Sequence, residues 1–504
     1  MLKSKIGKLS FIAAGAILFL ALVSCRNPFF PHDALKDSAG GAQIIPLSMA
    51  PPDTSVWARS VGSSDLTTTE AEFKSVAVDQ AGSAYAVGSQ KGSSAMKDFF
   101  YAYGDIKLHG WYSHTPVYVK YNAAGKEQWA KTVTPALAYG QGFFYSVAVD
   151  NAGNSFVAGA LNGEGIWNFG NGVKKTIDIG TTPVLIKYDA SGNAKWASVP
   201  SIKPVYAQFN SVAIAPDGSI YAAGYQVDNG AYDYGDGTNP LTLVSGTTSS
   251  NEGVCCPILV KYNSNGIAQW VVSTIESPGI AMYESVAVDG AGNVYVTGSQ
   301  DFDNETYTYS PGVTIDNGNI GQKPLLIKYN SSGALIWLRT LDSGPFFWGA
   351  GFRSVAVDRD GYIYVAGAQS YSGTYDYGNA VTLTGPSGYL ASPVLIQYDA
   401  DGNALWGRTT IDDSLETIFN SVAVSPDGGV FVAGKHEHPV ESHFGNGVST
   451  KGTNDFANPI IVKYDVHGDA LWAKSTTETE KPSEGLGNFV SVAASSNGSV
   501  FAVG

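Results

Sequence analysis

Hydrophobic and polar positions follow a short pattern that recurs along the chain. Residues 352–367 read FRSVAVDRDGYIYVAG: an apolar run, a polar stretch, and a β-branched and aromatic run. Asp358 opens the polar stretch and Gly361 lies three residues later, which is typical of a type I turn that ends in a left-handed glycine. The pattern therefore predicts two strands joined by a tight turn.

The Ser-Val-Ala triplet of this hairpin recurs, and a glycine always follows thirteen residues after its serine. The seven serines are Ser75, Ser146, Ser211, Ser285, Ser354, Ser421 and Ser491. Because the hairpin keeps one length, its turn fixes the strand register and keeps the same side chains buried.

A second hairpin of constant length follows the first. Residues 183–196, PVLIKYDASGNAKW, lead through a turn with Asp189 and Gly192 to a strand that contains Trp196. Six copies keep the tyrosine and the tryptophan eight residues apart, whereas the segments between hairpins vary in length. Each repeat is therefore predicted to have four antiparallel strands, with the tight turns at one end and the variable connections at the other.

Four-stranded units that repeat radially form a β-propeller, which protects its sheet edges by closing the ring. Seven first hairpins but six second hairpins leave one unit without its outer strands. Residues 55–62, SVWARSVG, match the fourth strands. We therefore expect an all-β, seven-bladed β-propeller over residues 54–504 whose ring is closed by the N-terminal strand. The remaining third strand has two explanations: the sequence is truncated after Gly504, or residues 43–49 stand in.

The N terminus has the features of a targeting segment. Residues 1–24 have three lysines among the first eight positions. They continue with fifteen apolar or small residues, a short run for a membrane span. The segment ends in Leu-Val-Ser-Cys25, which resembles the lipobox of bacterial lipoproteins, in which the signal is cut before an acylated cysteine. We expect Cys25 to carry a lipid anchor and residues 25–53, rich in Pro, Gly and Ser, to be a tether. The alternative is an ordinary signal peptide with an incidental cysteine.

Localisation and charge narrow the set of partners. Arg26 follows the cysteine in place of the Asp that retains enteric lipoproteins at the inner membrane, which favours the outer membrane of a bacterial cell envelope. The formal net charge is −14, and no Lys/Arg patch is visible, so nucleic acid is not an expected partner. We expect a monomer that contacts the membrane through its lipid anchor.

The tryptophans of the fourth strands are the first candidates for chemistry. The spacing Asp-x-x-Gly-x-x-x-Trp, as in Asp189 to Trp196, resembles the tryptophan-docking motif of pyrroloquinoline-quinone dehydrogenases, where the tryptophan locks neighbouring blades. We interpret the series as structural blade-docking residues and expect no cofactor. Its members are Trp57, Trp129, Trp196, Trp270, Trp337, Trp406 and Trp472.

Two further clusters were considered as sites. The adjacent Cys255 and Cys256 are similar to a ring disulfide that those dehydrogenases carry at their cofactor, but no calcium-binding carboxylate and amide set accompanies them, so a structural or partly oxidised pair is favoured. His436 and His438 lie at alternate positions of an extended segment, near His443, a spacing too loose to predict a metal. No catalytic set of nucleophile, base and orienting residue is evident.

The variable connections carry the unusual residues of the chain. A Tyr-x-Tyr-Gly-Asn pattern recurs between the second and third strands and is interpreted as a structural hairpin extension, which is compatible with a contact surface. Exposed aromatic side chains gathered on one face suggest a contact site. The binding residues expected there are Trp111, Phe346, Phe347 and Trp348.

Together, SVAVDRDGYIYVAG, the Tyr-x-Tyr-Gly-Asn insert and PVLIQYDADGNALW resemble the bacterial β-propeller repeat (SBBP-like) proteins over residues 54–504. The resemblance implies the fold and little about function. We expect a non-enzymatic binding or scaffold protein with a protein or glycan ligand. The alternative is an envelope enzyme, a lyase or a quinone-dependent dehydrogenase, that uses the central channel. Polar residues unique to single blades on the first strands would favour the enzyme; Asp150, Asp289 and Asp358 recur too regularly to qualify.

Overall fold

All regular structure in the computed structural model is β-strand. The described residues are 43–47, 57–63, 70–91, 100–109, 114–135, 140–201, 206–227, 231–235, 241–244, 254–301, 305–318, 321–345, 349–387, 390–410, 416–475 and 487–504. Within these ranges there is no helix, and hence none with the length and hydropathy of a membrane span.

The hairpin predicted at residues 352–367 is confirmed. β28 (Ala350–Val357) pairs antiparallel with β29 (Ile363–Ser370). Gly361 has a φ of 87°, and its N–H donates to the carbonyl oxygen of Asp358 at 3.2 Å. The Asp358 carboxylate accepts from the N–H of Tyr362 at 2.9 Å. The side chain thus closes the turn that the left-handed glycine ends.

Each repeat forms a unit of four antiparallel strands in chain order, and we name each unit after its first strand. In the β28 unit, β29 pairs with β32 (Ala391–Tyr398) and β32 with β33 (Ala404–Arg408). The others with this order are the β4 unit with β4 (Glu70–Val78), β5 (Ala84–Lys91), β8 (His114–Tyr121) and β9 (Glu127–Thr132); the β10 unit with β10 (Gln141–Val149), β11 (Ser155–Asn162), β14 (Thr181–Tyr188) and β15 (Ala194–Ser198); the β16 unit with β16 (Tyr206–Ile214), β17 (Ile220–Val227), β20 (Cys255–Tyr262) and β21 (Ala268–Ser273); the β22 unit with β22 (Ala281–Val288), β23 (Val294–Asp301), β26 (Gln322–Tyr329) and β27 (Leu335–Arg339); and the β34 unit with β34 (Thr417–Val424), β35 (Val430–Glu437), β38 (Ala457–Tyr464) and β39 (Ala470–Ser475). A parallel pair, Thr181 with Tyr206, joins the β10 and β16 units into one sheet.

The two ends of the chain share a unit. β40 (Ser491–Ala494) pairs with β41 (Val500–Val503), β41 pairs with β1 (Gln43–Leu47), and β1 pairs with β2 (Arg59–Ser60). β2 lies within the segment expected to be a fourth strand. β1 lies within residues 43–49, so the structure takes the missing third strand from the range that the sequence assigned to the tether.

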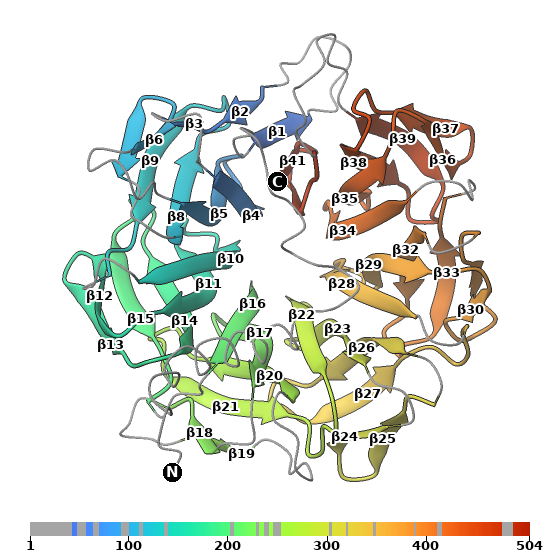
Figure 1. Ribbon diagram of the computed structural model, residues 1–504, viewed down its shortest axis with the longest axis horizontal. Coiled ribbons are helices and arrows are strands. Elements are labelled where there is room, and N and C mark those ends of the chain that lie inside the picture. Colours follow the sequence, from blue (N-terminus) through green and yellow to red (C-terminus); the bar gives the residue numbers. More distant parts are fainter. Residues whose placement is uncertain are drawn as a thin grey trace, which may run out of the picture.

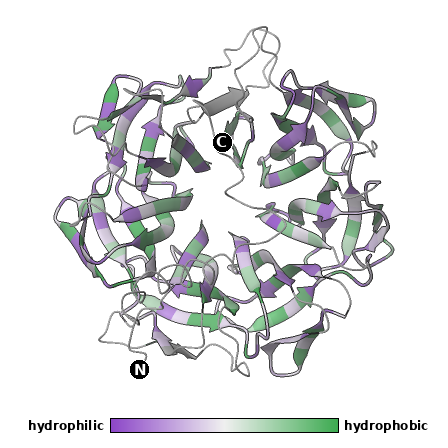
Figure 2. Ribbon diagram, in the orientation of Figure 1, coloured by the Kyte–Doolittle hydropathy of each residue, from purple (hydrophilic) through white to green (hydrophobic). Residues whose placement is uncertain are grey.

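The units lie around a common centre with their first strands innermost (Figure 1). Successive first strands contact one another from β4 through β10, β16, β22, β28 and β34 to β40, and β40 contacts β4. Hydrophobic residues run through the strands of every unit (Figure 2). Buried clusters span neighbouring units: Tyr295 and Leu326 of the β22 unit pack with Phe352 and Val355 of the β28 unit. The architecture is a propeller-like repeat fold.

One hydrogen bond recurs between the first strands. The serine hydroxyl of a Ser-Val-Ala triplet accepts from the N–H of the valine in the next triplet, as Ser354 does from Val422 at 3.1 Å. Ser491 accepts in the same way from Val76 at 3.2 Å, which links β40 to β4. The other pairs are Ser75 with Val147, Ser146 with Val212, Ser211 with Val286, Ser285 with Val355 and Ser421 with Val492. The repeated serine is therefore an architectural residue.

Six of the described fourth-strand tryptophans pack against the following unit. Trp337 donates from Nε1 to the carbonyl oxygen of Ala400 at 3.1 Å, and a Cβ on Gly402 would lie 3.0 Å from its indole. Equivalent bonds of 3.1 Å join Trp57 to Ala123, Trp196 to Ser264, Trp270 to Ser331 and Trp406 to Val466. Trp129 contacts Gly192 of the next unit, and Trp472 packs at 6.1 Å from Phe431 within its own unit. The turn glycine and the tryptophan of the repeat meet across unit boundaries.

Hairpins inserted between the second and third strands lie at the outer rim (Figure 1). They are β6 (Phe100–Tyr103) with β7 (Ile106–His109), β12 (Gly165–Gly170) with β13 (Val173–Ile177), β18 (Ala231–Asp233) with β19 (Thr242–Val244), β24 (Thr306–Ser310) with β25 (Val313–Asp316), β30 (Thr374–Asp376) with β31 (Thr382–Thr384), and β36 (Glu441–Gly445) with β37 (Val448–Lys451); β3 (Gly62–Ser63) pairs with β6. Tyr377 of the Tyr-x-Tyr-Gly pattern donates to Oε1 of Gln369 at 2.9 Å. The expected structural hairpin extension is confirmed.

Candidate functional site

The aromatic binding residues expected from the sequence, Trp111, Phe346, Phe347 and Trp348, lie outside the described residues, as does Cys25. The candidate sites below are therefore built from other side chains.

The histidines are held apart. His436 is buried in β35, with Nδ1 at 3.0 Å from the hydroxyl of Ser442, and burial lowers its pKa to about 4. His438 follows the end of the strand with a φ of 62°, and its Nδ1 donates to the carbonyl oxygen of Asp455 at 2.7 Å. The chain turns between the two residues, so their alternate spacing does not bring the rings together. No group of three potential metal ligands occurs among the described residues.

The adjacent cysteines are not bonded to each other. Both lie buried in β20, where Cys255 is disulfide-bonded and Cys256 takes part in no disulfide. Successive residues of a strand point to opposite faces, which separates the two sulfur atoms. The ring disulfide considered from the sequence is therefore wrong.

A β-bulge lies just before the Ser-Val-Ala triplet in the longer first strands. In β28, Phe352 and Ser354 pair with the adjacent residues Gly367 and Ala366, which leaves Arg353 unpaired in the ladder. A bulge redirects a side chain out of the regular alternation. The residue at this position differs from unit to unit: Lys74, Tyr145, Asn210, Glu284, Arg353 and Asn420.

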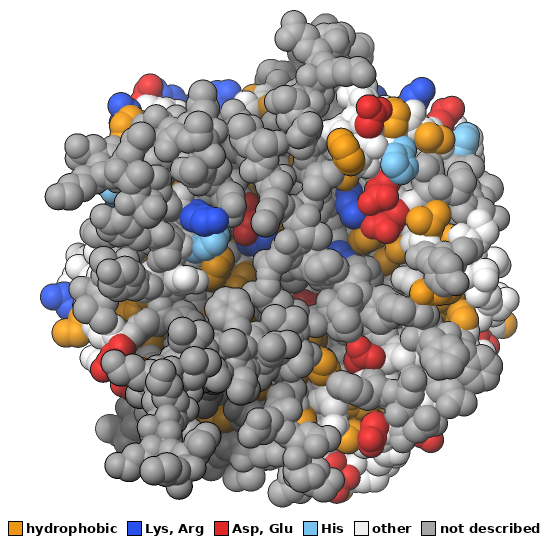
Figure 3. All heavy atoms as spheres, in the orientation of Figure 1, with side chains coloured by type: hydrophobic (Ala, Val, Ile, Leu, Met, Phe, Trp, Pro, Cys, Tyr) orange, Lys and Arg blue, Asp and Glu red, His pale blue; other side chains and the backbone are white. Residues whose placement is uncertain are grey.

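Several bulge side chains reach the neighbouring first strand. Arg353 donates from Nη1 to Oδ1 of Asn420, and Asn420 donates from Nδ2 to Oδ1 of Asn488 at 2.7 Å. Asn210 donates to the carbonyl oxygen of Tyr283 at 2.8 Å. Because these strands are the innermost ones, the hydrogen-bonded bulge residues lie near the centre of the fold (Figure 1). Acidic and basic side chains are visible near the centre of the face in Figure 3.

Charges of both signs meet in this central cluster. Burial raises the pKa of the Glu284 carboxyl, and the charge of Arg353 opposes that shift. Burial lowers the pKa of Arg353 to about 10, opposed by Glu284 and Glu416. Glu416 also pairs with Nζ of Lys435 at 2.8 Å. Side chains of this kind are able to make charge-assisted hydrogen bonds to a polar ligand.

This cluster was not expected from the sequence, although a signal for it exists. The aspartates that end the first strands recur because they close the turns. The position directly before Ser-Val-Ala is the one that varies in polarity inside a fixed frame. Charged residues unique to single units, the feature that would favour an envelope enzyme, therefore do occur on the first strands, as Lys74, Glu284 and Arg353.

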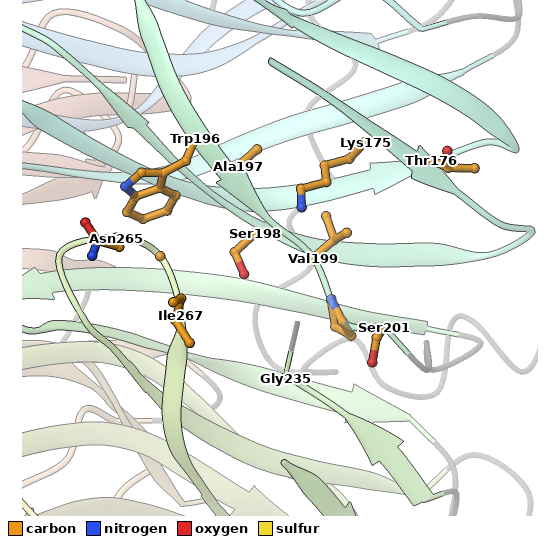
Figure 4. A pocket seen from close by; sticks show the side chains of 12 residues that line it. Lys175, Thr176, Trp196, Ala197, Ser198, Val199, Ser201, Gly235, Asn265 and Ile267 are labelled. Carbon is orange, nitrogen blue, oxygen red and sulfur yellow. The ribbon is translucent and has the colours of Figure 1, made fainter. Parts of the chain in front are cut away.

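A second candidate site is a groove between the β10 and β16 units (Figure 4). It has a volume of about 340 Å³ and is polar and open to solvent. Trp196 and Ser198 of β15 form one wall, Lys175 of β13 reaches toward it, and the turn with Asn265 and Gly266 forms the other wall.

Comparisons with known proteins give information on the fold and none on function. No protein-family model matches the chain. It is 23% identical over 456 residues to the uncharacterised WD repeat-containing protein L264 of Acanthamoeba polyphaga mimivirus, covering 77% of this chain and 31% of that relative. The chain thus spans about a third of the relative's length. This likeness agrees with the recurring four-stranded units. The chain is an all-β repeat protein of propeller type.

Two solved structures resemble the chain weakly. A protein of unknown function from Bacteroides caccae matches with a TM-score of 0.34 and 11% identity, over 71% of this chain and 90% of that one. A protein of unknown function from Dyadobacter fermentans matches with a TM-score of 0.38 and 8% identity, over 71% of this chain and 94% of that one.

Proposed function

We propose that this protein is a lipid-anchored, SBBP-like β-propeller of the bacterial cell envelope that binds a protein or glycan without catalysing a reaction. The observation that carries the binding function is the set of bulge residues. In a chain whose repeats reuse Ser-Val-Ala for architecture, one central position carries Glu284, Arg353, Asn420 and Asn210 in different units. Side chains that differ between repeats and meet at the centre serve recognition better than packing.

The proposal includes a closed ring of seven blades. Two observations support it. The hydrogen bond between Ser491 and Val76 repeats, between the last and first units, the bond that joins the other neighbours. The β40 unit also takes two strands from the N-terminal part of the chain and two from residues 491–503. Exchange of strands between the chain ends removes the free sheet edges that an open array would leave.

Binding is tested by removing charges at the centre of the fold and, as a control, in an exposed turn. Arg353→Gln and Glu284→Gln should reduce the capture of glycans on an array, or of envelope proteins from a lysate, at least tenfold, since charge-assisted hydrogen bonds contribute about 1.5–3 kcal/mol each. Arg359→Gln removes the same charge as Arg353→Gln, but from the exposed turn between β28 and β29, and is the matched control. Loss of capture with Arg359→Gln alone would place the binding surface at the opposite end.

The lipid anchor is tested by mass spectrometry of the protein purified from membranes. The N-terminal peptide should begin at Cys25 and carry acyl chains, and Cys25→Ala should move the protein to the soluble fraction. The chain has three cysteines, of which Cys255 is disulfide-bonded and Cys256 is not. A peptide that joins Cys25 to Cys255, found in place of an acylated one, would contradict the anchor.

The alternative function, an enzyme that uses the channel, is favoured by one observation. Glu284 combines a raised pKa with a neighbouring cation, Arg353, which suits a general acid or base. Incubation with envelope polysaccharides should then release unsaturated or reduced-size products, and Glu284→Gln should abolish the release while binding persists. Binding without product formation supports the primary proposal.

A further inference from the structure

The groove between the β10 and β16 units lies at a position of the repeat whose side chain varies from unit to unit. The residue two positions after the docking tryptophan lies on the fourth, outermost strand of each unit. In chain order it is Arg59, Lys131, Ser198, Val272, Arg339, Arg408 and Lys474. Ser198 is the smallest of these side chains, and it lines the groove.

Arginine at this position fills the same space at other unit boundaries. Arg339 lies with Cζ 5.2 Å from the ring centre of Trp337. Its Nε donates to the carbonyl oxygen of Gly402 at 2.7 Å, its Nη2 to that of Asp401 at 2.7 Å, and its Nη1 to that of Leu338 at 3.0 Å. One guanidinium therefore stacks on the indole and satisfies three backbone carbonyls.

Two other boundaries repeat this arrangement. Arg408 donates to the carbonyl oxygens of Gly468 at 2.7 Å, His467 at 2.8 Å and Gly407 at 2.9 Å, with Cζ 5.2 Å from the ring centre of Trp406. Arg59 donates from Nε to the carbonyl oxygen of Gly125 at 2.9 Å and lies 5.7 Å from the ring centre of Trp57. The acceptor frame belongs to the repeat and not to one boundary.

The frame is present in the groove without its cation. The residues equivalent to Gly402, Asp401 and Leu338 are Gly266, Asn265 and Ala197, and all three line the groove. The backbone there has the same form: Gly266 has a φ of 79° against 80° for Gly402. Trp196 bonds to Ser264 at 3.1 Å, as Trp337 does to Ala400.

We propose that this groove binds the guanidinium of an arginyl side chain presented by a partner protein. The ligand would stack on Trp196 and donate to the carbonyl oxygens of Asn265 and Gly266, as Arg339 does within the chain. Arginine suits the site better than lysine, because its planar fork reaches several carbonyls at once and stacks on an aromatic face. The acidic chain, with a net charge of −14, attracts a basic segment.

The experiment uses the full chain in detergent and the probe N-acetyl-arginine amide, with N-acetyl-citrulline amide as the uncharged analogue and N-acetyl-lysine amide as the alternative cation. Binding is followed by calorimetry and by the ¹⁹F resonance of 5-fluorotryptophan at position 196. The arginine probe should bind at least tenfold more tightly than either analogue. Equal binding of arginine and citrulline would overturn the proposal.

Two variants separate occupancy of the groove from a change in folding. Ser198→Arg should supply the guanidinium internally and abolish probe binding, whereas Ser198→Ala should keep it. Conversely, Arg339→Ser should raise the number of bound probes by one and lower the melting temperature, and the arginine probe should restore part of that loss. Unchanged stoichiometry in Arg339→Ser together with unchanged affinity in Ser198→Arg would refute the site.

Lys175 distinguishes a cation site from an anion site. Its ammonium group reaches toward the groove (Figure 4), so Lys175→Gln should tighten binding of the arginine probe by removing a like charge. If the groove instead held an anion, inorganic phosphate would bind and Lys175→Gln would abolish that binding, which would contradict the proposal. Arg353→Gln, which tests the central cluster, should leave probe binding unchanged.

Discussion

At the scale of single residues, two separate properties can require glycine in a turn. One is the left-handed backbone conformation, and the other is the close approach of a neighbouring side chain. Gly192 has a φ of 76°, and a Cβ there would lie 2.9 Å from two indole carbons of Trp129. Gly218, in the tight turn of another hairpin, has a φ of 81° with nothing within 4 Å of such a Cβ. Both glycines meet the backbone requirement, and of these two only Gly192 also lies against an indole.

We expect Gly218→Ala to cost about 1–2 kcal/mol, the cost of a left-handed alanine. Gly192→Ala should cost more, because the indole of Trp129 must also move from its packed position. Thermal melting of both variants measures the difference. Equal shifts in melting temperature would mean that the tryptophan adjusts without loss, and that its contact with the turn contributes little.

His436 gives the fold a dependence on pH. Four other units have glutamine at this position, Gln90, Gln226, Gln300 and Gln369, and the β34 unit has a buried histidine with a pKa lowered to about 4. The unfolded chain binds this proton near pH 6.5 and the folded chain does not, so stability falls as the pH drops from 6.5 toward 4, by about 3 kcal/mol in total.

His436→Gln should remove this part of the pH dependence, since glutamine does not titrate. The melting temperature measured from pH 7 to pH 4 should fall less steeply in the variant. His467→Gln, in an exposed turn, is the control and should leave the slope as in the parent protein. A parent-like slope in His436→Gln would mean that the histidine is not held neutral by its burial.

At the scale of elements, one buried side chain of a rim hairpin pairs with one side chain of the second strand, and the two are either both polar or both apolar in five units. Tyr103, Tyr234, Tyr309 and Tyr377 donate to Gln90, Gln226, Gln300 and Gln369 at 2.7–2.9 Å. In the β10 unit both partners are apolar, with Leu161 in the strand and Phe169 in the hairpin, and both are buried. In these five units the hairpin covers its strand either with a hydrogen-bonded pair or with an apolar one, and in the β34 unit His436 instead bonds to Ser442 of the hairpin at 3.0 Å.

Removing one partner of a pair should cost more than removing both. Tyr377→Phe should lower the unfolding free energy by about 1–3 kcal/mol, because the buried Oε1 of Gln369 loses its donor. Adding Gln369→Leu should recover part of this loss by reproducing the pair of the β10 unit. A double-mutant cycle from chemical denaturation gives the coupling energy. Strictly additive effects would show that the hydroxyl and the amide do not stabilise each other.

The sequence predicted the elements better than the sites, for physical reasons. Turn length and strand alternation are local, so the hairpins, their left-handed glycines and their four-strand order follow from spacing alone. The bulge at Arg353 and the groove at Ser198 depend on contacts between units about 70 residues apart in sequence. Both are visible in the sequence only as variation inside a fixed frame, one position before Ser-Val-Ala and two after the tryptophan. Trp111 lies outside the described residues and stays a prediction.

At the scale of the whole molecule, the unit shared by the chain ends should decide whether the protein stays monomeric. Deletion of residues 43–47 removes β1, the strand between β2 and β41. The exposed edge of β41 should then promote association, because an unpaired edge strand templates pairing with another chain. Light scattering measures the association, and deletion of residues 28–42 is the matched control of the preceding segment. A monomeric protein without β1 would show that another segment protects this edge.

The position of β1 also determines how the molecule responds to mechanical force. A pull applied at Gln43 bears first on the four residue pairs that join β1 to β41 and the two that join β1 to β2. Units farther along the chain are loaded only after this seam has parted. Under tension from its N-terminal side the protein should therefore unfold in sequence order. The pairing of β1 with β41 and β2 should separate first.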